Sequence, residues 1–162
     1  MTEIVVGIAD MKIGQGEQLI KTSLGSCIAV CIYSREIRAG GMIHFMLPKM
    51  DETTVTKVDK GNIKIAKYGH PGILELIHQL QTKFKLKNND LTAKIFGGAK
   101  MLKNVSSEIG LHNEKIAREI LHNEKIKILA TKTGGEKGYK IDFDLNSGIV
   151  YCQVFGDKVE QF

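Results

Sequence analysis

Cysteine, proline and aromatic residues are scarce in this sequence. It contains three cysteines, two prolines and no tryptophan among 162 residues, and aromatic residues make up 6%. Three cysteines are too few, and odd in number, for a disulfide framework. The N-terminus lacks the basic region and the small-residue cleavage site of a signal peptide, and no apolar stretch approaches the roughly 18 residues that span a bilayer. We therefore expect a cytoplasmic protein with no membrane insertion.

The charge pattern argues against a nucleic-acid partner. The net charge is +5, but the lysines are scattered along the chain, and no basic cluster is interleaved with aromatic residues. A nucleic-acid groove usually combines both features. The lysine-rich surface indicates either a solvated face or a docking face for an acidic protein.

Length and hydrophobic periodicity predict one α+β domain over residues 1–162. The hydrophobic content of 43% is enough for a sizeable core. Strand-like runs dominate both ends, and helical spacing lies between them, which favours two main helices covering a β-sheet or β-sandwich. A polar loop is expected over 49–61 and a hairpin turn at Asn146-Ser147-Gly148. One helix is predicted to begin near Pro71, and a second is predicted to cover 112–121. The predicted strands are 3–9, 18–22, 28–33, 40–47, 92–96, 127–131, 139–145 and 149–155.

The segment from Thr22 to Pro48 carries the most chemistry. A turn of Gly25, Ser26 and Cys27 opens one apolar run, and the next run contains His44. If these runs pair as neighbouring strands, Cys27 and His44 can meet, and a cysteine beside a histidine is the minimum for thiol nucleophilic catalysis. The backbone N–H groups of the tight turn could also form an oxyanion hole.

Each of these residues also has a simpler interpretation. Cys27 could be a small buried hydrophobe, and His44 a core residue with satisfied hydrogen bonds. If the pair is catalytic, a third group should hold the imidazole in one tautomer, and Thr22 and Ser26 supply nearby hydroxyls. Thr22 could equally be an ordinary strand residue.

Two other kinds of site are disfavoured by spacing. Cys27 and Cys31 would lie roughly 13 Å apart along a strand, too far to chelate one zinc ion with His44. Cys31 and Cys152 are therefore expected in the core. The run Gly97-Gly98-Ala99-Lys100 lacks the spacing of a phosphate-binding loop and indicates a tight strand exit. The other four histidines show no partner spacing and are expected on the surface or on helix faces.

Five motifs occur in one order along nearly the whole chain: LGSC, GGMIHFMLP, AKIFGGAKM, an Ile-Gly pair followed by Asn113, and TGG. In this combination the chain resembles CheD, a family of chemoreceptor glutamine deamidases of bacterial and archaeal chemotaxis.

The resemblance implies a function, a site and partners. It implies an α+β fold similar to the catalytic domain of cytotoxic necrotizing factor toxins, and hydrolysis of receptor glutamine side chains to glutamate without a metal or organic cofactor. The family's Cys–His pair falls on Cys27 and His44, and Thr22 is the nearest match to its third residue. The implied partners are methyl-accepting chemotaxis receptors, as substrate, and the phosphatase CheC.

Some positions depart from the family pattern. Lys132 stands before the TGG turn where relatives often carry Asp, and Lys137 or Lys140 follows where they often carry Arg. His70 stands where the first long helix often has Asp. These changes keep a second hypothesis open, in which the chain is a non-enzymatic binding module that regulates CheC or the receptor.

Overall fold

The computed structural model describes residues 1–51, 64–101 and 108–162. Within these residues ten strands form two five-stranded sheets. Sheet I has the order β1-β3-β8-β9-β10 and sheet II the order β2-β5-β4-β6-β7. The strands are β1 (Thr2–Val5), β2 (Asp10–Gln15), β3 (Gln18–Leu24), β4 (Ile28–Ser34), β5 (Ala39–Phe45), β6 (Thr92–Gly97), β7 (Lys127–Thr133), β8 (Tyr139–Asp144), β9 (Val150–Val154) and β10 (Glu160–Gln161).

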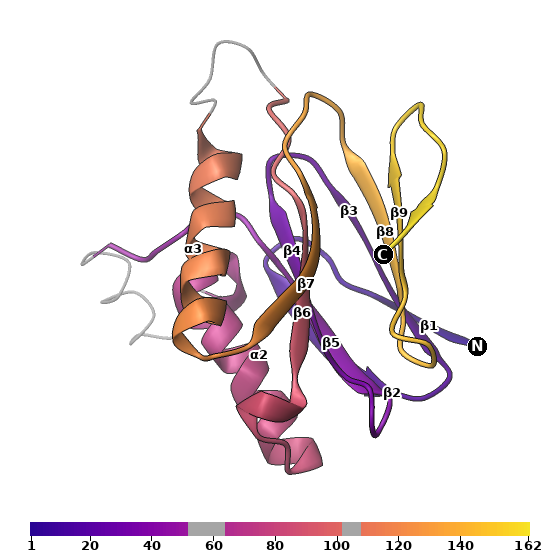
Figure 1. The fold of residues 1–162 in the computed structure, drawn as a ribbon. Helices are drawn as coiled ribbons and strands as arrows, with labels where there is room; N and C mark the ends of the chain where they lie inside the picture. The colour runs from indigo at the N-terminus through magenta and orange to yellow at the C-terminus, as the bar shows by residue number, and fades with distance from the viewer. Residues whose placement is uncertain (52–63, 102–107) are drawn as a thin grey trace.

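The elements stack in three layers, which confirms the predicted α+β class (Figure 1). The helices α2 (Gly69–Phe84) and α3 (Ile109–Asn123) cover one face of sheet II, and sheet I packs on the other face. Two short 3₁₀ helices, η1 (Ile65–Lys67) and η2 (Asn88–Asp90), complete the described elements.

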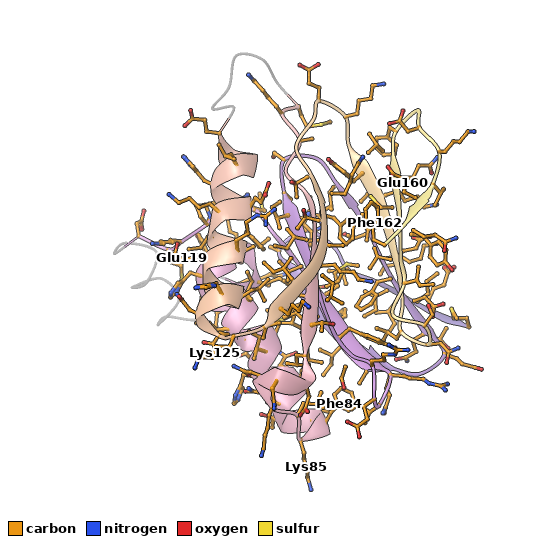
Figure 2. The ribbon with its side chains drawn as sticks, in the orientation of Figure 1. Phe84, Lys85, Glu119, Lys125, Glu160 and Phe162 are labelled. Carbon is orange, nitrogen blue, oxygen red and sulfur yellow. The ribbon has the colours of Figure 1, made fainter. Side chains whose placement is uncertain are left out.

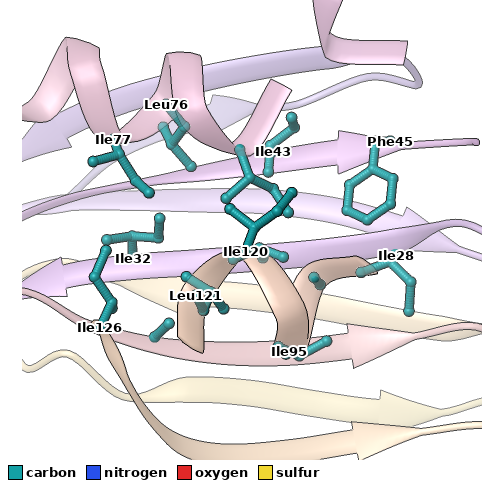
Figure 3. Close-up of a cluster of buried hydrophobic side chains, with 14 of the residues drawn as sticks. Ile28, Ile32, Ile43, Phe45, Leu76, Ile77, Ile95, Ile120, Leu121 and Ile126 are labelled. Carbon is teal, nitrogen blue, oxygen red and sulfur yellow. The ribbon is translucent and has the colours of Figure 1, made fainter. Parts of the chain in front are cut away.

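The central strand β4 divides its side chains between two cores. All seven of its residues are buried, as expected for a strand covered on both faces. Ile28 and Ile32 face the helices, where they join Leu76 of α2 and Ile120 of α3 (Figure 3). Cys31 faces sheet I. The two predicted apolar runs do pair, because β4 and β5 are antiparallel neighbours.

The helix α2 follows the predicted helical spacing, and α3 contains the predicted range 112–121. The buried residues of α2 include Ile73, Leu76, Ile77 and Leu80, spaced at threes and fours, and Pro71 lies in its first turn, where a missing N–H is tolerated. Each helix is followed by a lysine with a positive φ, Lys85 at 55° and Lys125 at 58°. Figure 2 shows both at the helix ends.

The predicted strands 139–145 and 149–155 are confirmed as β8 and β9, but the strand predictions were incomplete at both ends of the chain. The expected strand over 3–9 ends at Val5, since Ala9 adopts a φ of 58° and the chain crosses from sheet I to sheet II. The strand β2 that follows was not predicted, and β10 was also missed. Gly16, with a φ of 73°, and Glu17 connect the end of β2 at Gln15 to the start of β3 at Gln18.

Other local predictions are confirmed. The Asn146–Gly148 segment joins β8 to β9, with the N–H of Gly148 donating to the carbonyl of Asp144 at 2.8 Å. Most of the polar loop expected over 49–61 lies outside the described residues.

Candidate active site

The strand register brings Cys27 and His44 to the same face of sheet II. Ala29 pairs with His44 across the β4–β5 ladder, and Cys27 precedes Ala29 by two residues. Side chains alternate between faces along a strand. Ala29 and Met42 pack between the two sheets and Cys27 packs against them, so His44, two residues after Met42, faces the same side. Cys27 lies one residue outside β4, and in the continued register it is diagonal to His44; diagonal neighbours in a regular ladder have Cα atoms about 7–8 Å apart.

A hydrogen-bond chain from sheet I fixes the imidazole. The Oγ1 atom of Thr22 on β3 lies 2.8 Å from Nδ1 of His44 and donates to the carbonyl oxygen of Val6 at 2.8 Å. A threonine hydroxyl has one proton. Since that proton goes to Val6, the hydroxyl must accept from His44, which assigns the proton to Nδ1 and leaves the lone pair on Nε2.

The environment of His44 keeps it neutral. Its side chain is 2% exposed, and burial lowers its pKa to about 4 from 6.5. Nε2 is buried and has no hydrogen-bond partner among the described residues. A neutral imidazole with a free Nε2 has the protonation state that a general base needs.

Cys27 is the most accessible of the three thiols. It is half-buried, whereas Cys31 and Cys152 are each 1% exposed and lie in the core between the sheets, as predicted. Burial also raises the pKa of Cys27 above its ordinary value. Thiol and imidazole are therefore both neutral near pH 7, so the sulfur needs a base during attack rather than before it.

The turn that carries Cys27 is held by two glycines at the end of β6. The N–H of Gly98 donates to the carbonyl of Cys27 at 2.8 Å. A Cβ atom on Gly97 would lie 2.4 Å from the same carbonyl oxygen, and the φ of Gly97 is 103°. Only glycine fits this close approach. The tight strand exit predicted here is confirmed, and its role is to support Cys27.

The N–H groups of Ser26 and Cys27 donate to no backbone carbonyl within the described ranges. The carbonyl of Gly25, by contrast, accepts from the N–H of Ala99 at 2.9 Å. Uncommitted donors beside a nucleophile are what an oxyanion hole requires.

A cavity of about 380 Å³ opens beside the imidazole. Thr22 and His44 lie in its wall, and Cys27 does not. Its rim includes the exposed apolar side chains of Val5 and Ile8. The charged residues of the wall are Lys21, Lys140 and Asp142.

Three of the positions that depart from the family pattern, Lys132, Lys137 and His70, do not line this cavity. Lys132 pairs with Glu160 at 3.1 Å, and His70 is exposed, as are the other three histidines outside the site. Lys140 lines the cavity beside His44.

Two groups that support the site had no role assigned from the sequence. The carbonyl of Val6 could not be singled out, because every residue offers one, and Asn113 stood only as part of a motif. Asn113 is fully buried on α3 and donates from Nδ2 to the carbonyl of Met46 at 2.9 Å, and a polar residue on an apolar helix stripe was the available signal. In the part of the chain that the structure describes, no group of three or more His, Cys, Asp or Glu side chains could hold a metal ion.

A half-buried thiol and a neutral imidazole thus lie on one face of sheet II, and comparison with known proteins identifies the family. The model for CheD, described as CheD chemotactic sensory transduction, matches residues 46–154. The chain belongs to this family.

Curated relatives extend the match over the N-terminal part that holds Thr22, Cys27 and His44. A protein of Desulforamulus reducens is 36% identical, covering 98% of this chain and 94% of its own. Proteins of Pyrococcus horikoshii (35% identical, 93% and 91%) and Clostridium botulinum (37% identical, 95% and 94%) are similarly related. All three are named "Probable chemoreceptor glutamine deamidase CheD".

A structure of the Bacillus licheniformis hypothetical protein YfiH has a TM-score of 0.43 at 11% identity, covering 70% of this chain and 46% of that one. None of the described helices is both long and apolar enough to cross a bilayer.

Proposed function

We propose that this protein is a glutamine deamidase that converts glutamine side chains of chemotaxis receptors to glutamate in the cytoplasm. Membership of the CheD family and the names of its relatives support this substrate. The observation that carries the chemistry is the hydrogen bond between Thr22 and His44. It leaves Nε2 of a neutral imidazole free on the face of sheet II that Cys27 shares.

The first half of the reaction forms a thioester. Nε2 of His44 accepts the thiol proton as the sulfur of Cys27 attacks the carboxamide carbon, and the C–S bond forms. The N–H groups of Ser26 and Cys27 stabilise the oxyanion. The imidazolium then gives its proton to the amide nitrogen, the C–N bond breaks and ammonia leaves.

The second half hydrolyses that thioester. The neutral imidazole takes a proton from water as its oxygen attacks the same carbon. The C–S bond breaks, and the sulfur recovers its proton from His44. The net change is a glutamine and a water consumed, and a glutamate and ammonia produced. Both halves of the reaction use the thiol of Cys27, the imidazole of His44 and water, so neither half requires a cofactor.

The consequence for the receptor is electrostatic. Each event replaces a neutral side chain with an anion, which changes repulsion between neighbouring helices and can bias a signalling state. We further propose that a CheC-type phosphatase binds over the same site and competes with the receptor.

The test is incubation of the protein with cytoplasmic receptor fragments, followed by peptide mass mapping for amide-to-acid conversion. Wild type should convert specific glutamines, and Cys27→Ala should convert none. Cys152→Ala, which removes a core thiol on sheet I, is the matched control and should retain activity. If wild type and Cys27→Ala both leave every receptor fragment unchanged yet bind it equally well, the protein is a binding module and the deamidase proposal fails.

A further inference from the structure

The strand pairing that aligns Cys27 with His44 stops just before it reaches Cys27. The last pair of the β4–β5 ladder is Ile28 with Phe45. Beyond it, Cys27 and Met46 belong to segments that separate, because the N–H groups of Met46 and Leu47 both donate to the carbonyl of Lys67. The ladder alone therefore does not fix the distance between the thiol and the strand end that carries the imidazole.

The first turns of α3 contact both segments at this point. A Cβ on Gly110 would lie 2.4 Å from the carbonyl oxygen of Gly98, so the helix backbone touches the loop whose N–H holds Cys27. Three residues later, Nδ2 of Asn113 donates to the carbonyl of Met46 at 2.9 Å. One rigid helix end thus connects the Cys27 turn to the segment that follows His44.

The chemistry of Asn113 indicates that its amide has a purpose beyond packing. The side chain is 0% exposed and occupies the buried stripe of α3. Its Oδ1 has no partner among the described residues, and a buried polar atom without a partner destabilises a fold by about 1–3 kcal/mol. A leucine would fill the same stripe without that penalty, so the hydrogen bond to Met46 is the feature that the amide provides.

We propose that Asn113 is a positioning residue for the deamidation reaction. Through its bond to Met46, and with Gly110 packed against Gly98, it sets the separation of the thiol of Cys27 from the imidazole of His44. This inference rests on the proposed function for its catalytic consequence. Its geometric part concerns only the reactivity of Cys27 and can be measured without a receptor.

The decisive variant is Asn113→Leu, which preserves side-chain size and removes the donor. Alkylation of Cys27 by iodoacetamide should slow by roughly tenfold at pH 7, and kcat on receptor fragments should fall by roughly 10–100-fold with KM unchanged, because a displacement of about 1 Å can cost that much. Ser34→Ala is the matched control. It alters another buried polar residue with a partnerless hydroxyl, at the far end of β4, and should leave both rates within about twofold of wild type.

A double-mutant cycle separates positioning from general destabilisation. If Asn113 acts through His44, then Asn113→Leu should slow alkylation in wild type and have no further effect in His44→Ala. An equal slowing in both backgrounds, or no slowing in either, overturns the proposal. Should Asn113→Leu be unfolded by circular dichroism, Asn113→Ser, whose hydroxyl is too short to reach Met46, replaces it with the same expectations.

The alkylation readout also keeps the two proposals distinct. If Cys27 alkylation depends on His44 and Asn113 while no receptor glutamine is converted, the geometric part of the inference stands, and its catalytic part fails together with the deamidase proposal. If receptor glutamines are converted and Asn113→Leu changes neither kcat nor alkylation, the deamidase stands and the positioning role fails.

Discussion

The hydroxyl of Thr22 lies 2.8 Å from Nδ1 of His44, and this contact joins the two sheets at the candidate site. Thr22 comes from β3 of sheet I and His44 from β5 of sheet II. The hydroxyl proton is donated to Val6, so the imidazole must present its Nδ1–H to Thr22. A side chain of one sheet therefore sets the tautomer of a base carried by the other.

Thr22→Val should remove this control while keeping side-chain shape. Without the hydroxyl, Nε2 of His44 is protonated in part of the population, and that part cannot act as a base. We expect kcat to fall by roughly 100-fold, within the range that a general base contributes. Thr22→Ser keeps the hydroxyl and should stay close to wild type. Nitrogen NMR of the His44 ring should show a mixed tautomer in Thr22→Val alone, and an unchanged Nδ1–H signal in that variant would contradict the assignment.

The pH dependence of catalysis should reflect the buried imidazole. Burial lowers the pKa of His44 to about 4, so the free protein keeps a neutral base down to that pH. The acid limb of kcat/KM, which reports the free enzyme's essential groups, should fall near pH 4. A limb near pH 6.5 would show that the imidazole is solvated. Samples returned from low pH to pH 7 before assay provide the control for irreversible unfolding.

The sequence was sufficient for the pairing of β4 with β5 and for the placement of Cys31 and Cys152, because period-two alternation and β-branched runs are local signals. It was not sufficient for β2. There the chain crosses between the sheets at Ala9, which has a φ of 58°. Alanine has no preference for positive φ, so the residue type does not predict this crossing. The candidate site shows the same division. Cys27 and His44 stand in motifs, whereas the acceptor at Val6 is a backbone carbonyl brought close only by the crossing.

Stability should rise with pH across the range in which His44 is charged when unfolded and neutral when folded. Between about pH 4 and 6.5 the unfolded chain binds the extra proton, so the free energy of unfolding increases with pH. The full effect is about 3 kcal/mol at pH values above 6.5, and it is lost as pH falls towards 4. Urea unfolding of wild type and His44→Gln at matched pH values isolates the contribution of His44. If the free energy of unfolding changed with pH in the same way in both proteins, that result would be inconsistent with a buried neutral imidazole.

Iodoacetamide should modify Cys27 before the other two cysteines in the native protein. Cys31 and Cys152 are 1% exposed, and burial raises the pKa of Cys152 to about 11. We expect at least about tenfold faster labelling of Cys27 at pH 7, since thiol reactivity follows exposure and thiolate formation. Peptide mapping of partly labelled protein measures the order. In urea the labelling rates of the three cysteines should converge. Comparable labelling rates in the native protein would show that Cys27 is no more accessible than Cys31 and Cys152, which would contradict the proposed site.

Gly97→Ala should damage both the fold and the Cys27 turn. Its φ of 103° is unfavourable for alanine, and the added Cβ would approach the carbonyl of Cys27 to 2.4 Å. Gly134→Ala is the matched control, since Gly134 also has a positive φ, 83°, but nothing lies within 4 Å of its Cβ position. Backbone strain alone should cost each variant about 1–3 kcal/mol in urea unfolding. Gly97→Ala should lose more than Gly134→Ala and, alone of the two, should slow Cys27 alkylation, because only its Cβ displaces the turn. Equal losses and unchanged alkylation in both would mean that the close approach at Gly97 does not position the thiol.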